Sequence, residues 1–302
     1  MATHTLVVGP GAIGSLFASL LLRTGCRVTI LDRHPDRADH ISTHGLKVDG
    51  AGAALPVHAT VHPTEVEAFD LVLLCVKAYD TVNAVQDIAP VCPPGTRVVS
   101  LQNGIGNLEA IRENLPSASI FASATYHGAS LCAPGHVIHA GAGKTILSPM
   151  NPADSCASLA TFFDGAGIEC ECFSDAEALL WGKLVVNTAI NPLTAIHGVT
   201  NGSLLEHGEL REQMHAAARE AARVAAARGV SLVFSDPAAE AETVCRRTAD
   251  NTSSMLQDIR RKRMTEVEWI TGVVHREAGR LGIPVPVNDD LLFQIRGMTP
   301  LP

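Results

Sequence analysis

The sequence predicts an α/β protein with two parts: a doubly wound, Rossmann-type domain over residues 1–173 and an all-helical domain over residues 174–302. Up to about residue 150, apolar strand-like segments alternate with helix-like segments, which is typical of a parallel sheet with helices on both faces. From Ser174 onward the chain reads as nearly all helix, and Ala-rich Gln213–Arg228 is its clearest stretch. No low-complexity linker separates the two parts, so we expect them to pack closely, with the site in the cleft between them.

The strand candidates of the first part are short runs rich in Val, Ile and Leu. They lie at residues 5–9, 27–31, 70–76, 97–101 and 119–124, with helical segments such as 12–23 and 80–89 between them. Later strand signals occur at 136–140, 145–149 and 168–172, separated by a helix near 155–165. Since an open parallel sheet binds ligands beyond the carboxyl ends of its strands, the residues that follow these strands are candidates for a site.

The first strand runs directly into the pattern G-x-G-x-x-G. In a dinucleotide-binding fold the first glycine allows a tight turn, the second lets the backbone approach a pyrophosphate, and the third allows close packing of strand and helix. The helix that follows offers its free N–H groups to the anion. The pattern therefore predicts a dinucleotide site, with an unrelated turn as the alternative, at Gly9, Gly11, Ala12, Ile13 and Gly14.

Other strand ends carry polar side chains. The second strand ends in Asp32 and Arg33, where a fold of this type places the side chains that read the ribose. The strand at 70–76 delivers Lys77, and the strand at 97–101 delivers the segment Gln102–Gly106, which contains Asn103.

Charge and hydropathy exclude several classes of protein. The chain of 302 residues has a formal net charge of −8, and no basic cluster is large enough to indicate nucleic acid. We interpret its densest basic run, Arg260–Arg263, as a solvated face. The longest apolar stretches fall short of the ~20 residues that span a bilayer. Because the first strand begins almost at Met1, we expect no signal peptide and a cytoplasmic protein without a membrane segment.

The eight cysteines and 13 histidines do not form a recognisable framework. The cysteines are scattered, so we expect reduced, mostly structural thiols. The pair Cys170-x-Cys172 has the ligand types of a metal site, but no second pair accompanies it, and the histidines include no H-E-x-x-H. We therefore predict no metal site.

The most informative stretch of the second part is Trp181–Ala195, in which Lys183, Asn187 and Asn191 recur every four residues. This spacing places the three side chains on one face of a helix whose other residues are largely apolar. A lysine and two amides in a buried helix are unfavourable unless a polar group meets them, so we expect this face to contact a substrate. The alternative is a set of internal caps and network contacts. Pro192 disfavours helical geometry at Asn191, so we expect the helix to end or kink there.

Lys183 is the candidate general acid. Burial lowers the pKa of a lysine toward neutrality, where the ammonium group donates a proton efficiently. Hydride addition to a carbonyl carbon needs a proton or a positive charge at the developing alkoxide. The two asparagines can donate and accept hydrogen bonds in fixed geometry, which suits hydroxyl and carboxylate groups.

Two more polar segments lie farther along the chain. Asn251 precedes an apolar turn, where it could contact a ligand or simply cap a helix. The segment Met264–Gly272 is expected to open a long helix, with Glu266 at the border of its apolar face and Glu268 in solvent.

Taken together, these residues resemble the ketopantoate reductase (2-dehydropantoate 2-reductase) family over nearly the whole chain. The glycine loop is generic, whereas three later motifs are specific: Lys-x-x-x-Asn-x-x-x-Asn-Pro-Leu-Thr-Ala from Lys183, Asn-x-Ser-Ser-Met-Leu-Gln-Asp-Ile from Asn251, and the Thr-Glu element at 265–272. All three follow Asn103–Gly106 in the order that the family shows.

The resemblance implies an NADPH-dependent oxidoreductase that reduces 2-dehydropantoate to (R)-pantoate, a step toward pantothenate and coenzyme A. It implies that Lys183 protonates the ketone oxygen and that Asn103 sits between nicotinamide and substrate. Lys77 would contact the cofactor, and Glu266 matches the acidic residue near the nicotinamide ribose and the lysine. The substrate-binding set implied by the resemblance is Asn103, Asn187, Asn191, Asn201 and Ser254, with Asn251 nearby.

The choice of cofactor stays open at this point. Arg33 matches the arginine with which the family reads the adenosine 2′-phosphate of NADP(H), which the resemblance favours. Asp32 immediately before it suits the ribose hydroxyls of NAD(H) and repels a phosphate.

Two alternatives remain beside the main hypothesis. One is a related NAD(P)H-dependent reductase of another small 2-oxo acid, and the other is a non-catalytic dinucleotide sensor, which has no need for Lys183. The Ala-rich helices can pack within the domain or against a second subunit, so a homodimer is an open expectation.

Overall fold

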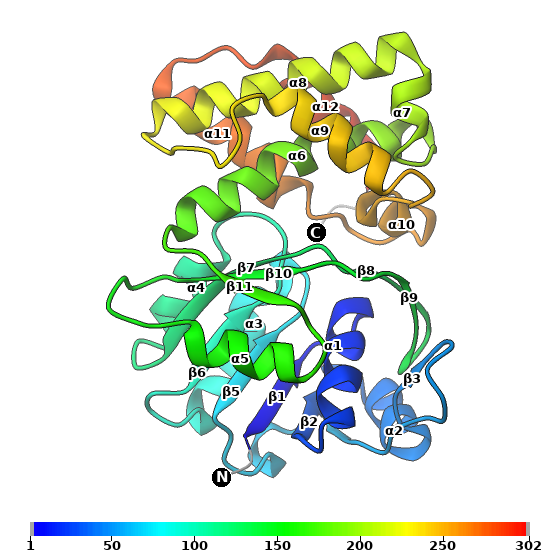
Figure 1. Cartoon of the computed structure of the whole chain (residues 1–302), viewed down its shortest axis with the longest axis vertical. Helices are drawn as coiled ribbons and strands as arrows, with labels where there is room; N and C mark the ends of the chain where they lie inside the picture. The colour runs from blue at the N-terminus through cyan, green and yellow to red at the C-terminus, as the bar shows by residue number, and fades with distance from the viewer. Residues whose placement is uncertain (1–2, 300–302) are drawn as a thin grey trace. The chain divides into compact units, whose positions relative to one another are not determined.

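The computed structural model describes residues 3–299, and the chain divides into two compact units. The first unit extends to Ala176 and the second begins at Glu177 (Figure 1). A short segment of the first half, Asn103–Ile105, groups with the second unit. The predicted fold class is confirmed, because the first unit is a mainly parallel sheet with helices and the second is helical.

The first unit is built on an eight-stranded sheet with the order β11-β10-β7-β6-β5-β1-β2-β4. Its strands are β1 (His4–Val8), β2 (Arg27–Leu31), β4 (His58–Thr60), β5 (Leu71–Leu74), β6 (Arg97–Ser100), β7 (Ser119–Thr125), β10 (Thr145–Pro149) and β11 (Cys170–Cys172). Neighbouring strands are parallel except for β7 and β10. The order of connection reverses between β1 and β5, and such a switch point is where open α/β sheets bind ligands.

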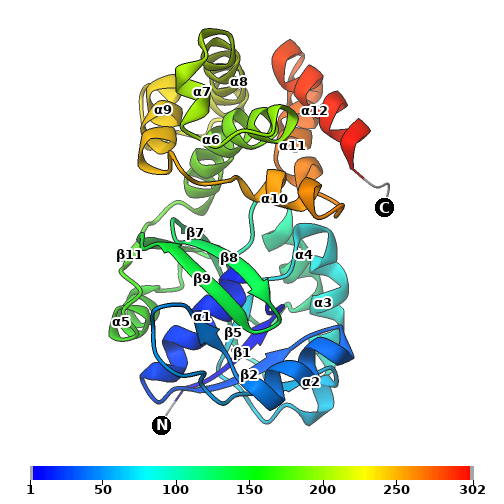
Figure 2. The same ribbon diagram turned by 90° about the vertical axis from the view of Figure 1, so that its right-hand side faces the viewer.

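Helices cover both faces of this sheet (Figure 2). They are α1 (Ala12–Arg23), α2 (Pro35–His44), α3 (Thr81–Ile88), α4 (Asn107–Asn114) and α5 (Ala157–Gly165). Phe17 of α1 and Phe163 of α5 meet edge to face, with ring centroids 6.1 Å apart, in the main apolar core. Helices α3 and α4 pack together on the other face, where the hydroxyl of Thr81 donates to Oδ1 of Asn107 over 2.9 Å.

A small second sheet, with the order β3-β9-β8, is less visible in the sequence. Its strands are β3 (Lys47–Val48), β8 (Gly128–Ala133) and β9 (His136–Gly141). The strand expected at 136–140 is β9, whereas its antiparallel partner β8 is not signalled by the sequence because its residues are half-exposed and do not alternate. This sheet packs on α1, where Val48 of β3 and Val137 of β9 join Leu16 of α1 in one apolar cluster.

The second unit consists of α6 (Ala176–His197), α7 (Ser203–Glu206), α8 (Gly208–Ala227), α9 (Pro237–Arg247), α10 (Ser254–Arg260), the 3₁₀ turn η4 (Val267–Trp269), α11 (Thr271–Leu281) and α12 (Pro286–Met298). Helix α6 is its longest helix, and α8 contains the Ala-rich stretch noted in the sequence. The alanines on one side of α8 are completely buried, which lets neighbouring helices approach closely.

The sequence left two outcomes open at Asn191, an end or a kink of the helix, and the first of them is wrong. Helix α6 continues through Pro192 to His197. Leu193, Thr194 and Ala195 beyond the proline are buried, and the hydroxyl of Thr194 donates back toward the carbonyls of Ile190 and Asn191 at 3.0 Å each. Burial of this last turn therefore outweighs the unfavourable geometry that proline imposes on the residue before it.

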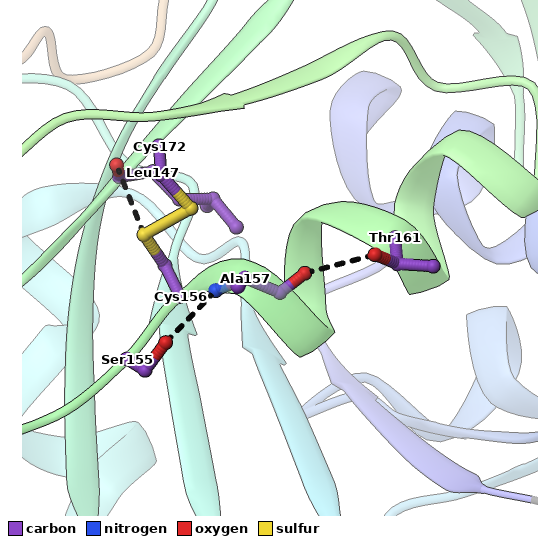
Figure 3. The surroundings of a disulfide bond; sticks show 6 residues. All are labelled: Leu147, Ser155, Cys156, Ala157, Thr161 and Cys172. Carbon is purple, nitrogen blue, oxygen red and sulfur yellow. Dashed lines mark hydrogen bonds between the residues drawn. A yellow bond between two sulfur atoms is a disulfide. The ribbon is translucent and has the colours of Figure 1, made fainter.

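The expectation that all cysteines are reduced is also wrong. Figure 3 shows a disulfide bond between Cys156, at the start of α5, and Cys172, the last residue of β11. Their Cα atoms are 5.9 Å apart, within the range that a disulfide bridges. The bond ties α5 to the strand that follows it, so Cys172 belongs to this pair and not to a Cys170-x-Cys172 metal site. Across residues 3–299, no cluster of three or more metal-ligating side chains forms.

We expect the Cys156–Cys172 bond to stabilise the first unit. Closing a loop of about 15 residues restricts the unfolded chain and contributes about 3 kcal/mol in the chain-entropy model. Urea denaturation with and without dithiothreitol measures this contribution, and Cys172→Ser should match the reduced protein. The exposed thiol Cys132 provides the control, because Cys132→Ser should leave the denaturation curve unchanged. Superimposable curves with and without reductant would contradict the assignment.

Among the described helices, none combines the length and the apolar character needed to cross a membrane.

Candidate active site

The glycine loop lies where β1 passes into α1, at the switch point of the sheet. Gly9 adopts φ +91°, a left-handed conformation that glycine accepts without strain, and a Cβ there would lie 2.7 Å from Cγ1 of Val76. A Cβ on Gly14 would lie 2.3 Å from the carbonyl oxygen of Gly9. A Cβ on Gly11 meets no protein atom within 4 Å. Gly9 and Gly14 are thus required by the loop itself, whereas Gly11 leaves open space beside the backbone.

This geometry fits the pyrophosphate of a dinucleotide. Gly11 is the N-cap of α1 and makes no side-chain capping bond, so the first N–H groups of the helix are available to an anion. The backbone N–H of Gly11 instead donates to the carbonyl of Gly9 over 2.8 Å, which closes the turn. Ala12 and Ile13 occupy the first turn of α1.

The ends of β5 and β6 lie beside this loop in the sheet order. Lys77 follows β5, is partly buried, and is the N-cap of a short 3₁₀ turn, Ala78–Asp80. Gln102 follows β6, and its side-chain amide donates to the carbonyl of Val76 over 3.0 Å and to the hydroxyl of Thr81 over 2.7 Å. Gln102 therefore fixes the strand end that carries Lys77.

The structure shows how Asp32 and Arg33 differ. The side chain of Asp32 is 1% exposed and is held by the guanidinium of Arg37, whose Nη2 lies 2.5 Å from its Oδ1, and by the backbone N–H of His34. The side chain of Arg33 is 58% exposed and pairs with Asp80 at the N-terminus of α3. Asp32 is neutralised inside the protein, whereas Arg33 presents its charge at the surface of the first unit.

Lys183, Asn187 and Asn191 all lie on α6 in the second unit. Lys183 and Asn187 are partly buried, and Asn191 is buried. Burial lowers the pKa of Lys183 from its ordinary value to about 8, and the carboxylate of Glu266 opposes part of this shift. The ammonium group thus lies in a poorly solvated environment with one acidic neighbour.

Glu266 lies in a bend, not in a helix. It is 5% exposed and immediately precedes η4, and the long helix α11 begins only at Thr271. The expectation of a helix from Met264 is therefore wrong, because the chain must turn here to bury Glu266. Glu268 is also more than a solvated side chain: it accepts from Nε of Arg296 over 2.6 Å and from Nη2 over 2.9 Å.

The segment with Asn103 is attached to this bend. The backbone N–H of Ile105 donates to the carbonyl of Trp269 over 3.0 Å. Gly104 adopts φ +84°, and a Cβ there would lie 2.4 Å from the same carbonyl oxygen. The backbone that directly follows Asn103 is therefore held against the turn that follows Glu266, in the unit that also contains Lys183.

A second polar group surrounds the start of α10. The N-cap of α10 is Ser253, whose hydroxyl accepts from the N–H of Leu256 over 3.2 Å, so Asn251 is not the cap. The hydroxyl of Thr194 on α6 lies 2.7 Å from that of Ser253 and accepts from it, because the proton of Thr194 is directed to the carbonyls of its own helix; this contact places Ser254 beside the last turn of α6.

Asn201 and Asn251 belong to the same group. The backbone N–H of Asn201 donates to the carbonyl of Asn251 over 3.1 Å, and its side-chain amide donates to Thr248 over 2.8 Å. Asn201 is 8% exposed, and its Oδ1 has no hydrogen-bond partner within the described chain. Buried amide oxygens normally accept a hydrogen bond, so this atom is suited to a donor on a ligand.

The expected site residues fall into two groups. The first unit contains the glycine loop, Asp32, Arg33 and Lys77. The second unit contains the others, which are Asn103, Lys183, Asn187, Asn191, Asn201, Asn251, Ser254 and Glu266. Sequence reasoning missed Arg37, the partner of Asp32, although its position in the first turn after Pro35 could have indicated it. It also missed Trp269, which holds the Asn103 segment.

The comparisons with known proteins agree over nearly the whole chain. Residues 5–152 match the family model "Ketopantoate reductase PanE/ApbA", and residues 175–299 match "Ketopantoate reductase PanE/ApbA C terminal". The 2-dehydropantoate 2-reductase of Halobacterium salinarum is 36% identical over 97% of this chain and 98% of its own. A PanE/ApbA family ketopantoate reductase from Ralstonia eutropha superposes with a TM-score of 0.89, at 31% identity and 98% coverage of both chains. A D-mandelate dehydrogenase solved with NADH and anilino(oxo)acetate also has a TM-score of 0.89, at 27% identity and 98% coverage of both. By these matches and its three specific motifs, the chain belongs to the ketopantoate reductase family.

Proposed function

We propose that this enzyme reduces 2-dehydropantoate to (R)-pantoate with NADPH, with Lys183 as the general acid. The observation that carries the proposal is Lys183 itself: a lysine on a buried helix, aligned with two asparagines, with a pKa lowered to about 8 beside Glu266. Such a group is protonated at neutral pH and still gives up its proton readily. For a lysine with a purely structural role, burial of the ammonium group in this poorly solvated position would only lower the stability of the protein.

The reaction needs one hydride and one proton. When bound, the reduced nicotinamide supplies the hydride to the carbonyl carbon of the 2-oxo acid. Nζ of Lys183 gives its proton to the carbonyl oxygen as negative charge develops there, so the ketone becomes a secondary alcohol. Glu266 keeps Lys183 protonated before the reaction, because its carboxylate favours the charged form of the amine.

The amides of the second unit supply the groups that a hydroxylated 2-oxo acid requires. Asn187 and Asn191 follow Lys183 along α6 at intervals of four residues, so they can bind the oxygens next to the ketone. Asn201, with its unpartnered Oδ1, can accept from the substrate hydroxyl, and Ser254 can donate to its carboxylate. We assign Asn103 and Asn251 to the same substrate group.

The pairing of Asp32 supports NADPH over NADH. An unpaired carboxylate at this position would repel a 2′-phosphate. Here the carboxylate is buried and paired with Arg37, and Arg33 carries an exposed positive charge next to it. Arg33 can exchange its pairing with Asp80 for the phosphate, which offers two negative charges in place of one.

We expect Arg33→Ala to weaken NADPH selectively. Loss of a charged hydrogen bond to the phosphate should raise the KM for NADPH about tenfold or more and leave the KM for NADH unchanged. Arg37→Ala should also weaken NADPH, because it releases the charge of Asp32, and adding Asp32→Asn should restore binding. Initial rates with both cofactors measure these effects. Equal losses for NADPH and NADH in Arg33→Ala would contradict the assignment.

A second 2-oxo acid is a specific alternative substrate, because the D-mandelate dehydrogenase with the same fold was solved with NADH and anilino(oxo)acetate. The test is a comparison of kcat/KM for 2-dehydropantoate, phenylglyoxylate and 2-oxoisovalerate with each cofactor. Higher efficiency for 2-dehydropantoate with NADPH supports the proposal, and higher efficiency for phenylglyoxylate would favour the alternative. A protein that binds NADPH and turns over none of the three acids would be a sensor.

A further inference from the structure

A buried polar network lies in the helical unit, on the side of α6 that turns away from Lys183. It consists of Thr188, Thr271, Asn288 and Glu220, from α6, α11, α12 and α8. Thr188, Thr271 and Asn288 are completely buried, and Glu220 is 5% exposed. Figure 1 shows these four helices gathered in the second unit.

The hydrogen bonds of this network are complete and directional. Oγ1 of Thr188 lies 2.9 Å from Oγ1 of Thr271 and 2.9 Å from Oδ1 of Asn288. Because a hydroxyl has one proton and an amide oxygen can only accept, Thr188 donates to Asn288 and accepts from Thr271.

The amide group of Asn288 continues the network into α8. Its Nδ2 donates to Oε2 of Glu220 over 2.8 Å and to the carbonyl of Ala217 over 3.1 Å. The carboxylate of Glu220 also accepts from the backbone N–H groups of Val287 and Asn288, at the start of α12. Every member of the network is therefore satisfied, which makes it a rigid connection between four helices.

Its position relates the network to the active site. Thr188 follows Lys183 by five residues, so its side chain lies about 140° around the helix. Thr271 follows Glu266 by five residues, and the intervening turn is fixed by hydrogen bonds from Trp269 to Glu266 and from Ile270 to Val267. The Thr188–Thr271 bond thus joins the helix that carries Lys183 to the bend that carries Glu266.

Apolar packing alone would fix the position of α6 relative to the bend with Glu266 less well. Leu184, Val185 and Ala189 next to Thr188 on α6 are aliphatic, and contacts between aliphatic side chains tolerate small rotations and shifts of a helix. Hydrogen bonds do not tolerate them, because their strength falls steeply with distance and angle.

We propose that the Thr188–Thr271–Asn288–Glu220 network is a positioning device that sets the rotation of α6 and so holds Lys183 against Glu266. The inference rests on the proposed function, in which Lys183 is the acid. Thr188 and Thr271 act through Lys183 and are positioning residues. Among the described residues, Glu266 is the charged group that acts on Lys183, and Glu220 is the charged member of the network.

The test compares two substitutions at one position. Thr188→Val keeps the shape of the side chain and removes both hydrogen bonds, whereas Thr188→Ser keeps the hydroxyl and loses a methyl group. We expect Thr188→Val to lower kcat by roughly ten- to a hundredfold, because a small misplacement of a catalytic group has effects of this size. The KM for NADPH should not change. Thr188→Ser should retain most of the activity.

The pH profile separates positioning from a general loss of stability. The high-pH limb of kcat/KM reports the pKa of Lys183, and in Thr188→Val it should move to lower pH, toward the limb of Glu266→Gln. Thr271→Val, which leaves the bond between Thr188 and Asn288 in place, should move it in the same direction. Val224→Ala, a cavity in the core of α8 outside the network, should lower the melting temperature and leave the limb in place.

A double-mutant cycle completes the experiment. If the network acts through the Lys183–Glu266 pair, Thr188→Val should have little further effect on kcat in a Glu266→Gln background. Additive losses, or a Thr188→Val limb at the wild-type pH or above it, would overturn the inference. The proposed function fails on a different result, namely full activity in Lys183→Ala.

Discussion

Replacing Lys183 with alanine should reduce kcat for ketopantoate reduction by about 10²- to 10⁴-fold, the usual contribution of a general acid. The substitution removes the only proposed proton donor to the ketone oxygen and leaves the glycine loop, Arg33 and Lys77 unchanged. NADPH should therefore bind with an unchanged Kd, which fluorescence titration of the cofactor measures. Lys47→Ala, at an exposed lysine of β3, is the matched control and should keep wild-type turnover. Wild-type turnover in Lys183→Ala would falsify the assignment of the acid.

The pH dependence provides an independent measure of the same group. In the proposed mechanism the reduction requires protonated Lys183, whose pKa is about 8. We expect kcat/KM for reduction to be constant below about pH 7 and to fall tenfold per pH unit well above pH 8. The reverse oxidation requires the neutral amine, so its rate should rise over the same range. Glu266→Gln removes the charge that raises the pKa of Lys183, so it should move both limbs to lower pH.

The features that the sequence predicted well depend on local rules. The glycine loop could be located because its glycines have a fixed spacing, and the close contact that Gly14 makes with Gly9, five positions away, is one local reason for that spacing. The polar face of α6 could be located because Lys183, Asn187 and Asn191 follow the period of one helix. In both cases the spacing of the residues along the chain determines how their atoms are arranged in the fold.

The features that the sequence did not reveal depend on distant contacts or on packing. The attachment of Asn103–Ile105 to the carbonyl of Trp269 joins segments far apart in the chain. The Cys156–Cys172 bond depends on how α5 returns to β11, and cysteine spacing alone does not determine it. Helix α6 passes Pro192 because the residues beyond it are buried, and a local rule cannot weigh that burial.

The pairing of Asp32 is the instructive intermediate case. Its carboxylate, taken alone, favours NADH, because it can accept from the ribose hydroxyls. The structure shows that Arg37, in the first turn of α2, forms an ion pair with this carboxylate inside the protein. The cofactor preference that an acidic residue at this strand end indicates thus depends on whether a nearby cation already neutralises its carboxylate.

Alanine substitutions at two glycines of the loop should both weaken cofactor binding, but only the one at Gly14 should also lower the stability of the fold. A Cβ at Gly14 would lie 2.3 Å from the carbonyl oxygen of Gly9, so β1 and α1 must separate to accept it. We expect Gly14→Ala to lower the free energy of unfolding by about 3 kcal/mol, at the upper end for an overpacked core, and to abolish NADPH binding as a consequence.

Gly11→Ala should leave the stability within about 0.5 kcal/mol of the wild type, because its φ of −72° suits alanine and its Cβ meets no protein atom. The added methyl group instead occupies the space that a pyrophosphate needs against the backbone, so NADPH affinity should fall at least about tenfold. Urea denaturation and NADPH titration of both variants separate the two roles. A stable Gly11→Ala protein that binds NADPH as tightly as the wild type would contradict the placement of the pyrophosphate at this turn, because the open space beside Gly11 would then serve no ligand.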